Sequence, residues 1–313
     1  MSARRPLPHW ADVALLPVLN LLLALLISGI VIALIGQNPF DALRILVYGA
    51  FGYGEGLGFT LHFATDFVFT GLAMAFAAHA GLFNIGGEGQ AYVGALGAVL
   101  VALALDNTSW LLVLPAAIIG SAVAGGLWAF IPGYLQAKRG SHVVITTIMF
   151  NFIASALMIY LLVNVLSPKG SMNPETRTFD PNAHLPLIHD VLAGLGIAVA
   201  RSPLNLAFLW ALICAVVVWL LLWHTTLGYQ LRVLGANPSA AAYAGMKPQR
   251  LIIIAMLISG ALSGFLALNE IMGAQNRLLL EFTSGYGFVG IAVALMGRSA
   301  EESGCAEHDD ANE

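Results

Sequence analysis

Long apolar windows, separated by charged or turn-forming residues, make up most of the chain. A helix needs about 20 apolar residues to cross the hydrocarbon core of a bilayer, so each window predicts one membrane-spanning helix. The windows cover residues 13–36, 67–87, 89–105, 110–137, 142–168, 204–223, 251–269 and a shorter 286–297. The pattern predicts an all-α, polytopic integral membrane helical bundle of about eight spans, with residues 1–298 as the transmembrane domain.

Composition supports a membrane protein and excludes several other classes. Hydrophobic residues make up 59% of the chain, charged residues 10%, and the mean hydropathy is +0.84, outside the usual range of soluble domains. Two cysteines, Cys214 and Cys305, are too few for a disulfide framework or a metal cluster, so no metal site is predicted. A net charge of −4 without a dense basic run argues against nucleic-acid binding.

The distribution of basic residues predicts the orientation in the membrane. Cytoplasmic loops retain Lys and Arg, so the two possible orientations differ in their count of inside charges. A cytoplasmic N-terminus puts eight basic residues inside and five outside. The eight are Arg4, Arg5, Lys138, Arg139, Arg232, Lys247, Arg250 and Arg298. We therefore expect both the N-terminus and the C-terminus inside. The first window follows no convincing cleavage site, so it is expected to be a retained span rather than a signal peptide.

A glycine-rich stretch, GLFNIGGEGQAYVGALGA at residues 81–98, joins the second and third windows. Glycines allow backbones to approach closely or a helix to break inside a membrane, where the break faces protein or a water-filled cavity. The stretch is expected at the cytoplasmic side of these spans or dipping into the membrane. Glu88 then starts a helix, as a cap or with a direct role in transport. Asn84 and Gln90 either join helices by hydrogen bonds or face the solute path.

The fifth window contains three polar residues, Thr146, Thr147 and Asn151. Residues 147 and 151 are four apart and share a helix face. A threonine hydroxyl can bond its own helix, whereas a buried amide needs another partner, so Asn151 is the foremost candidate for lining a solute path. At the outer end of the seventh window, Asn269 and Glu270 are expected to form a solvated cap.

Enzyme chemistry and ion-coupled transport find little support. Ser259 is predicted in the middle of a span, and the histidines His79, His142 and His224 near span ends, so no serine dyad is expected. The chain has no GxxxxGK[ST] phosphate loop, so an ATP-driven process needs a separate subunit. A secondary transporter or channel remains an alternative, but it would carry mid-membrane charges, which the predicted spans almost lack.

The polar segment 234–250 predicts a short surface helix. Asn237-Pro238-Ser239 is a typical helix start and Gly245 a typical stop, and the residues between them are small. Such a helix suits docking into a cleft on another protein. An ordinary amphipathic loop helix is the alternative.

Three stretches carry a resemblance to a known family: GLFNIGGEGQ, KRGSHVVITTIMFNFIA at 138–154, and LGANPSAAAYAGMKPQRLIIIAMLISGALSGFLA at 234–267. Together, in order over roughly residues 10–298, they resemble the permease subunit of binding-protein-dependent ABC importers in the branched-chain amino acid/ribose permease superfamily. The form of the first stretch is most similar to the nucleoside (guanosine-type) subgroup. The resemblance implies translocation of a small polar solute, a nucleoside, with a simple sugar or a branched-chain amino acid as alternatives.

The same resemblance implies partners and sites. It implies a cytoplasmic ABC ATPase dimer that uses ATP, a second permease subunit (copy or paralogue) and an extracytoplasmic solute-binding protein, with no cofactor on this chain. It implies a bacterial plasma membrane, the inner membrane in a Gram-negative cell. The implied ATPase-coupling residues are Gly235, Asn237, Ala241, Ala242, Tyr243, Ala244 and Gly245. The solute-pathway candidates are Asn84, Glu88, Gln90, Thr147 and Asn151.

The C-terminal sequence departs from this pattern. After GYGFVGIAVALMGR, members of the family continue through about two more spans, whereas residues 299–313 read SAEESGCAEHDDANE and are polar and acidic. Such a tail cannot span a membrane. We expect a shifted reading frame or a truncated gene model, with a genuinely shortened subunit as the alternative.

Overall fold

The computed structural model describes residues 15–168, 170, 173–197 and 199–309. These residues form helices and loops, with two isolated β-bridges. The chain divides into two compact units, Gly58–Ala294 and a second made of Met1–Leu57 and Leu295–Glu313.

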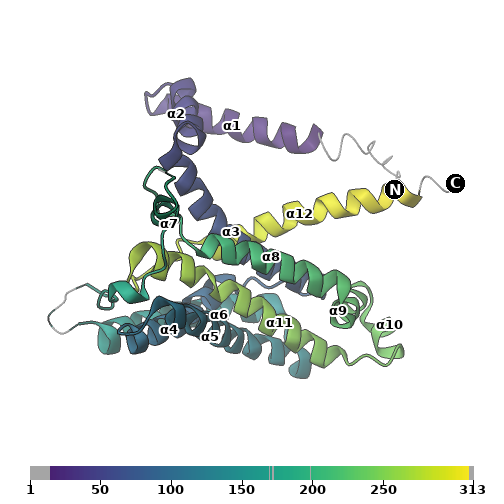
Figure 1. The fold of residues 1–313 in the computed structure, drawn as a ribbon. Helices are drawn as coiled ribbons and strands as arrows, with labels where there is room; N and C mark the ends of the chain where they lie inside the picture. The colour runs from purple at the N-terminus through teal and green to yellow at the C-terminus, as the bar shows by residue number, and fades with distance from the viewer. Residues whose placement is uncertain (1–14, 169, 171–172, 198, 310–313) are drawn as a thin grey trace. The chain divides into compact units, whose positions relative to one another are not determined.

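Six helical segments among the described residues are long and apolar enough to cross a membrane. They are α3 (Gly54–His79), α4 (Gly87–Leu105), α5 (Trp110–Arg139), α6 with the π-helix η2 (Val143–Leu161, Leu162–Leu166), α8 (Ala207–His224), and α11 with the π-helix η4 (Pro248–Gly264, Leu268–Gln275). The all-α polytopic fold is thus confirmed, and each helix has its apolar window in the sequence (Figure 1).

The remaining two windows are not simple spans. The first corresponds to a bent pair, α1 (Leu16–Leu34) and α2 (Pro39–Phe51), whose axes turn by 118°. Asn38 starts α2 by accepting a hydrogen bond from the backbone N–H of Phe40 at 3.0 Å. The last corresponds to α12 (Tyr286–Asp309), whose apolar part ends at Gly297 and is shorter than a span. The described chain therefore has six spans, or seven with the bent pair, rather than eight.

The predicted second span, 67–87, is wrong in its boundaries. Helix α3 begins at Gly54 and ends at His79, and residues 80–86 are not helical. Glycines and the polar residues His62 and Asp66 made the first half of α3 look like a loop. In the structure both polar side chains are buried, at 3% and 0% exposed, so this half is an interior helix. A buried helix that pairs its polar groups internally has no simple apolar signature.

Glycines bring α4, α5 and α11 into close contact. A Cβ atom on Gly97 would lie 2.2 Å from the carbonyl oxygen of Gly120, and one on Gly94 would lie 2.5 Å from Cα of Gly264. Ser121 adds a hydrogen bond from its hydroxyl to the Gly264 carbonyl at 2.6 Å. Without a hydrophobic driving force inside a bilayer, such backbone approach is a main source of helix association. These three helices therefore form the packed centre of the unit.

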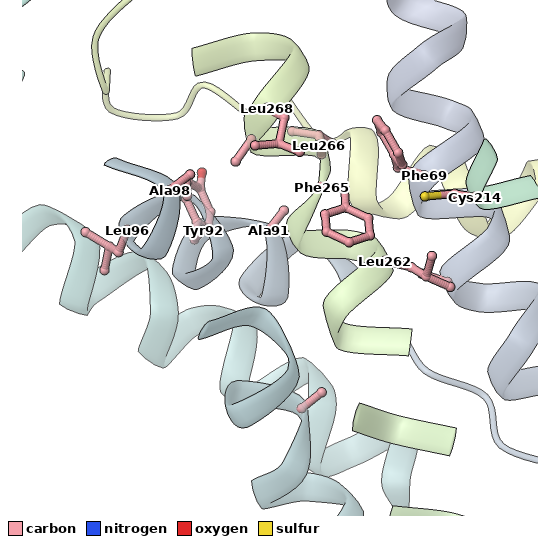
Figure 2. Close-up of a cluster of buried hydrophobic side chains, with 14 of the residues drawn as sticks. Phe69, Ala91, Tyr92, Leu96, Ala98, Cys214, Leu262, Phe265, Leu266 and Leu268 are labelled. Atoms are coloured by element: carbon pink, nitrogen blue, oxygen red, sulfur yellow. The ribbon is translucent and has the colours of Figure 1, made fainter. Parts of the chain in front are cut away.

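An aromatic and aliphatic cluster attaches α3 and α8 to this centre. Phe265, at the junction of α11 and η4, packs edge-on against Phe69 of α3 and Trp210 of α8, with ring centroids 5.9 and 5.6 Å apart. Figure 2 shows Phe265 and Leu262 facing Phe69 and Cys214, with Ala91 of α4 close by. The cluster joins four helices that are far apart in the sequence.

Polar contacts mark the two ends of the bundle. Lys138 donates to the Gln249 side chain at 2.9 Å, so the α5–α6 turn lies beside the beginning of α11. At the opposite end, Arg177 pairs with the buried carboxylate of Asp106 at 2.5 Å, and Arg277 pairs with Glu175 at 3.3 Å. We call these the Lys138 end and the Asp106 end. Which end faces the cytoplasm stays a prediction, and Arg4 and Arg5 of the basic-residue count lie outside the described residues.

A loop covers the Asp106 end. Between η2 and α8 it contains the short helices η3 (Pro181–Ala183) and α7 (Ile188–Gly194). The backbone N–H of Leu185 donates to the carbonyl of Met272 at 2.9 Å, which ties the loop to η4. The predicted polar connection 169–203 is thus partly folded onto the bundle.

We expect Gly97→Ala to lower the melting temperature of the purified chain in detergent. The added methyl meets backbone on Gly120, which cannot move away as a flexible side chain can, and such overpacking costs about 1–3 kcal/mol. Gly194→Ala is the matched control, because nothing lies within 4 Å of its added Cβ. Equal melting temperatures for the two variants would contradict this packing.

Candidate functional site

The chain between α3 and α4 turns back into the bundle. We call residues 80–86 the re-entrant segment. It begins at the Lys138 end, where a Cβ on Gly81 would lie 3.1 Å from Cα of Gly235. Just beyond its other end, in the first turn of α4, a Cβ on Gly89 would lie 2.9 Å from Cα of Asn151. Asn151 is two turns into α6, about 12 Å from its beginning at 1.5 Å per residue. Helix α4 therefore starts inside the bundle, the second of the two predicted placements.

The Glu88 carboxylate lies at the N-termini of two helices. It is in the first turn of α4 and only 7% exposed. Its Oε1 accepts hydrogen bonds from the Thr283 hydroxyl and from the backbone N–H of Gly285, the latter at 3.1 Å. Its Oε2 accepts from the N–H of Gly287 at 2.9 Å, at the start of α12. Free N–H groups and the positive ends of two helix dipoles make this buried carboxylate tolerable.

Asn84 and Gln90 hold the re-entrant segment against three helices. The Asn84 amide exchanges two hydrogen bonds with the Gln90 amide, both at 3.0 Å. Asn84 also donates to the Ser259 hydroxyl at 2.8 Å, and Ser259 donates to the Ala73 carbonyl at 2.6 Å. Both amides are buried, at 3% and 1% exposed. This network joins the segment to α4, α11 and α3, and it uses Ser259 as a structural hydroxyl.

Asn151 and Thr147 act differently, although they share a face of α6. Asn151 donates to the carbonyl of Ile85 and accepts from the N–H of Gly89, both at 2.9 Å. The N–H groups in the first turn of a helix have no intrahelical partner, so Asn151 caps α4 from outside. Thr147 donates to Val143 of its own helix at 2.8 Å. All five pathway candidates thus gather around the beginning of α4, where each is buried.

Segment 234–250 contains the predicted short helix. Helix α9 (Thr226–Ala236) leads to α10 (Pro238–Tyr243), and Figure 1 shows both at one end of α8 and α11. Asn237 caps α10 by accepting hydrogen bonds from the N–H groups of Ser239 and Ala240 at 3.0 and 3.1 Å. Gly245 has a φ of 77° and ends the turn. We call residues 234–250 the docking segment, after the role that the sequence predicts for it, and its Tyr243 side chain is 94% exposed.

The docking segment rests on the end of α3. A Cβ on Gly235 would lie only 2.3 Å from the carbonyl oxygen of His79. The His79 ring packs edge-on against Trp223, with centroids 6.2 Å apart, and Arg232 lies 4.3 Å from the Trp223 ring centroid. Gly235 also lies against Gly81, at the beginning of the re-entrant segment. A shift of α9 and α10 would therefore reach α4 through a short chain of contacts.

A second buried polar group was missed by the sequence analysis. The expectation of a solvated cap at Asn269 and Glu270 is wrong, because they are 0% and 6% exposed. Asn269 donates to the Asp66 carboxylate at 2.9 Å and to the His62 carbonyl at 3.0 Å. His62 and Asp66 are four residues apart, and this helical spacing could have revealed a shared face. The incorrect start of the second window hid it.

The comparisons with known proteins decide the family. The family model described as "Branched-chain amino acid transport system / permease component" matches residues 56–304. This range covers the whole bundle, the re-entrant segment and the docking segment. The chain belongs to this permease family.

Individual relatives align over most of both chains. The guanosine ABC transporter permease protein NupP of Bacillus subtilis is 38% identical over 287 residues, which are 90% of this chain and 79% of NupP. The nucleoside permease NupB of Lactococcus lactis is 32% identical, covering 90% and 78%. The glucose permease TsgB13 of Haloferax volcanii is 31% identical, covering 96% and 78%. No solved structure matches the chain.

We expect Asn151→Leu to lower both the melting temperature and solute uptake per copy in the membrane. The leucine leaves the Gly89 N–H and the Ile85 carbonyl buried without partners, at a cost of about 1–3 kcal/mol each. Thr147→Val is the control on the same face, since its hydroxyl bonds only its own helix. An Asn151→Leu protein as stable and active as the control would show that the cap is dispensable.

Proposed function

We propose that this permease is the membrane-spanning subunit of an ATP-driven importer that moves nucleosides. The observation that carries the solute class is the match to the guanosine and nucleoside permeases over 90% of the chain. A monosaccharide is the second candidate, because the glucose permease matches at 31% identity over 96% of the chain. Nucleosides and glucose share a polyhydroxylated sugar ring.

The energy for transport comes from a separate ABC ATPase that uses ATP, since the chain carries no phosphate loop. The ATPase dimer docks at the Lys138 end, on the docking segment, with Tyr243 reaching into its cleft. The high exposure of this large ring supports the assignment, because it makes almost no contact within the chain. Glycine and alanine around it permit a close fit.

Movement of the docked ATPase is transmitted to the membrane interior through a short chain of side-chain and backbone contacts. Closure shifts α9 and α10, and Gly235 passes the shift to His79 and to the re-entrant segment. That segment is fixed to the beginning of α4 by Asn84, Gln90 and Asn151. Glu88 connects the beginning of α4 to the beginning of α12. Asn84, Glu88, Gln90 and Asn151 thereby control the solute path, which α4 lines together with a second permease subunit, a copy or a paralogue.

The orientation follows from the docking assignment. The Lys138 end and the N-terminus face the cytoplasm of a bacterial cell, and the protein lies in the plasma membrane, the inner membrane in a Gram-negative cell. The Asp106 end, with its folded loop, then faces outward and receives the solute-binding protein. The short loop with Lys138 and Arg139 on the inside supports this orientation.

Uptake by cells that express the chain with its ATPase, its binding protein and the second permease subunit tests the solute class. Labelled guanosine, glucose and leucine are compared at equal concentration, with an ATPase-inactive strain as the control. We expect guanosine to be accumulated and to be displaced by other nucleosides. Accumulation of glucose alone would favour the monosaccharide assignment, and accumulation of leucine would contradict both.

We expect Tyr243→Ala to reduce solute uptake and solute-stimulated ATP hydrolysis at least about tenfold, with an unchanged melting temperature. The side chain contacts the partner rather than its own fold, so truncation removes interface contact of the kind that aromatic anchors supply. Tyr160→Ala is the matched control, a 60% exposed tyrosine on α6 outside the docking segment. Normal uptake by Tyr243→Ala would contradict docking at this residue.

A further inference from the structure

His62, Asp66 and Glu270 form a compact buried cluster apart from the start of α4. Each offers one ligand atom, and these atoms all lie within 4.8 Å of one another. The residues are 3%, 0% and 6% exposed. The Nε2 atom of His62 lies 3.1 Å from Oε1 of Glu270. Helix α3 provides the first two residues and the π-helix η4 provides the third, so the cluster bridges two segments about 200 residues apart.

Amide side chains surround the two carboxylates and orient them. Asn269 donates to Oδ1 of Asp66 at 2.9 Å, and Asn205 in turn donates to Oδ1 of Asn269 at 3.0 Å. Gln275 donates to Oε2 of Glu270 at 3.0 Å. Metal-binding carboxylates are held by outer hydrogen bonds of this kind, which fix their direction before an ion arrives. These amides engage one oxygen of each carboxylate, and the other oxygen of Glu270 faces Nε2 of His62.

Several atoms of the cluster lack a hydrogen-bond partner within the described residues. They are Oδ2 of Asp66, Nδ1 of His62 and Oε1 of Gln275, each fully buried. Asp66 is 0% exposed, so bulk solvent does not reach this oxygen. Buried polar atoms are almost always satisfied, and exceptions point to an ion or a water that completes the site.

Charge balance identifies the kind of ligand. Two carboxylates close together in a buried site cannot both be ionised without a compensating positive charge, and the basic group within the cluster is one imidazole. Burying such charges without compensation is costly. One divalent cation bound to both carboxylates and to a neutral imidazole leaves the site with no net charge. A cation therefore compensates the charge and gives the orphaned oxygen of Asp66 a partner.

We propose that His62, Asp66 and Glu270 bind a divalent transition-metal ion, Zn²⁺ or Mn²⁺. The donor set is one imidazole nitrogen with carboxylate and amide oxygens. Imidazole ligation suits first-row transition metals, whereas Mg²⁺ and Ca²⁺ favour oxygen ligands alone. The ion cross-links α3 to η4, and the wider turn of a π-helix, a feature common at functional sites, presents Asn269 and Glu270 to α3.

The site has a structural role distinct from the path around Glu88. The loop over the Asp106 end is tied to η4 by the bond from Leu185 to Met272. Fixing η4 to α3 therefore also fixes the position of Met272, to which that loop is hydrogen-bonded. Removal of the ion is expected to loosen this end of the bundle and to leave the docking segment folded.

Metal content and metal-dependent stability of the purified full chain test the site. The protein is stripped with a chelator, then loaded separately with Zn²⁺, Mn²⁺ or Ca²⁺, and bound ions are measured by mass spectrometry. We expect about one Zn²⁺ or Mn²⁺ per chain with a rise in melting temperature, and no comparable rise with Ca²⁺. Glu270→Gln and Asp66→Asn should weaken metal binding at least about tenfold, since each removes a ligand charge. Glu175→Gln, a carboxylate outside the cluster, should bind normally.

X-ray absorption at the metal edge of the wild-type chain makes the test independent of variant folding. It should report nitrogen and oxygen ligands that include one imidazole. Absence of a bound ion at equimolar Zn²⁺ and Mn²⁺, or a metal environment without imidazole, would overturn the proposal. Unchanged metal binding in a folded Glu270→Gln protein would do the same. Stability that responds to acidity and to no metal would assign the cluster to a shared proton instead.

Discussion

Every backbone N–H and carbonyl inside a bilayer needs a partner within the protein, because lipid offers none. The break between α3 and α4 makes this requirement acute. Helix α4 begins inside the bundle, with its first N–H groups unpaired by its own helix. Asn84 accepts from Gly86, and Asn151 accepts from Gly89, so two buried amides replace the missing turn. The arrangement of the surrounding helices follows from these bonds.

The same requirement explains why Glu88 occurs in such an apolar chain. Its two oxygens accept from Thr283, Gly285 and Gly287, so one side chain serves the beginnings of α4 and α12. A neutral glutamine there would offer one acceptor where the site presents several donors. The glycines of the stretch have a separate purpose, since Gly81 and Gly89 approach backbone atoms of Gly235 and Asn151. Close packing and polar pairing together turn a broken helix into a rigid connection.

The sequence predicted much of this architecture, and its failures have one physical cause. Apolar windows located most helices, because lipid-facing surface demands apolar side chains, and the Asn237 cap and Gly245 stop located α10 because both signals are local. The start of α3 and the burial of Glu270 were missed. Both depend on pairing between His62, Asp66 and Glu270, which are far apart in the sequence. Polar residues in an interior helix imitate a loop until their partners are known. The fine roles of the residues around α4 depend on the same long-range pairing.

Hydrogen–deuterium exchange of the wild-type chain in a lipid bilayer measures whether the beginning of α4 is held inside the bundle. The comparison is between backbone amides of residues 86–92 and those of the exposed turn at 194–197. We expect slow exchange over 86–92, because Asn84 and Asn151 engage the first N–H groups and the site is buried. Exchange over 86–92 as fast as in the exposed turn would contradict this arrangement.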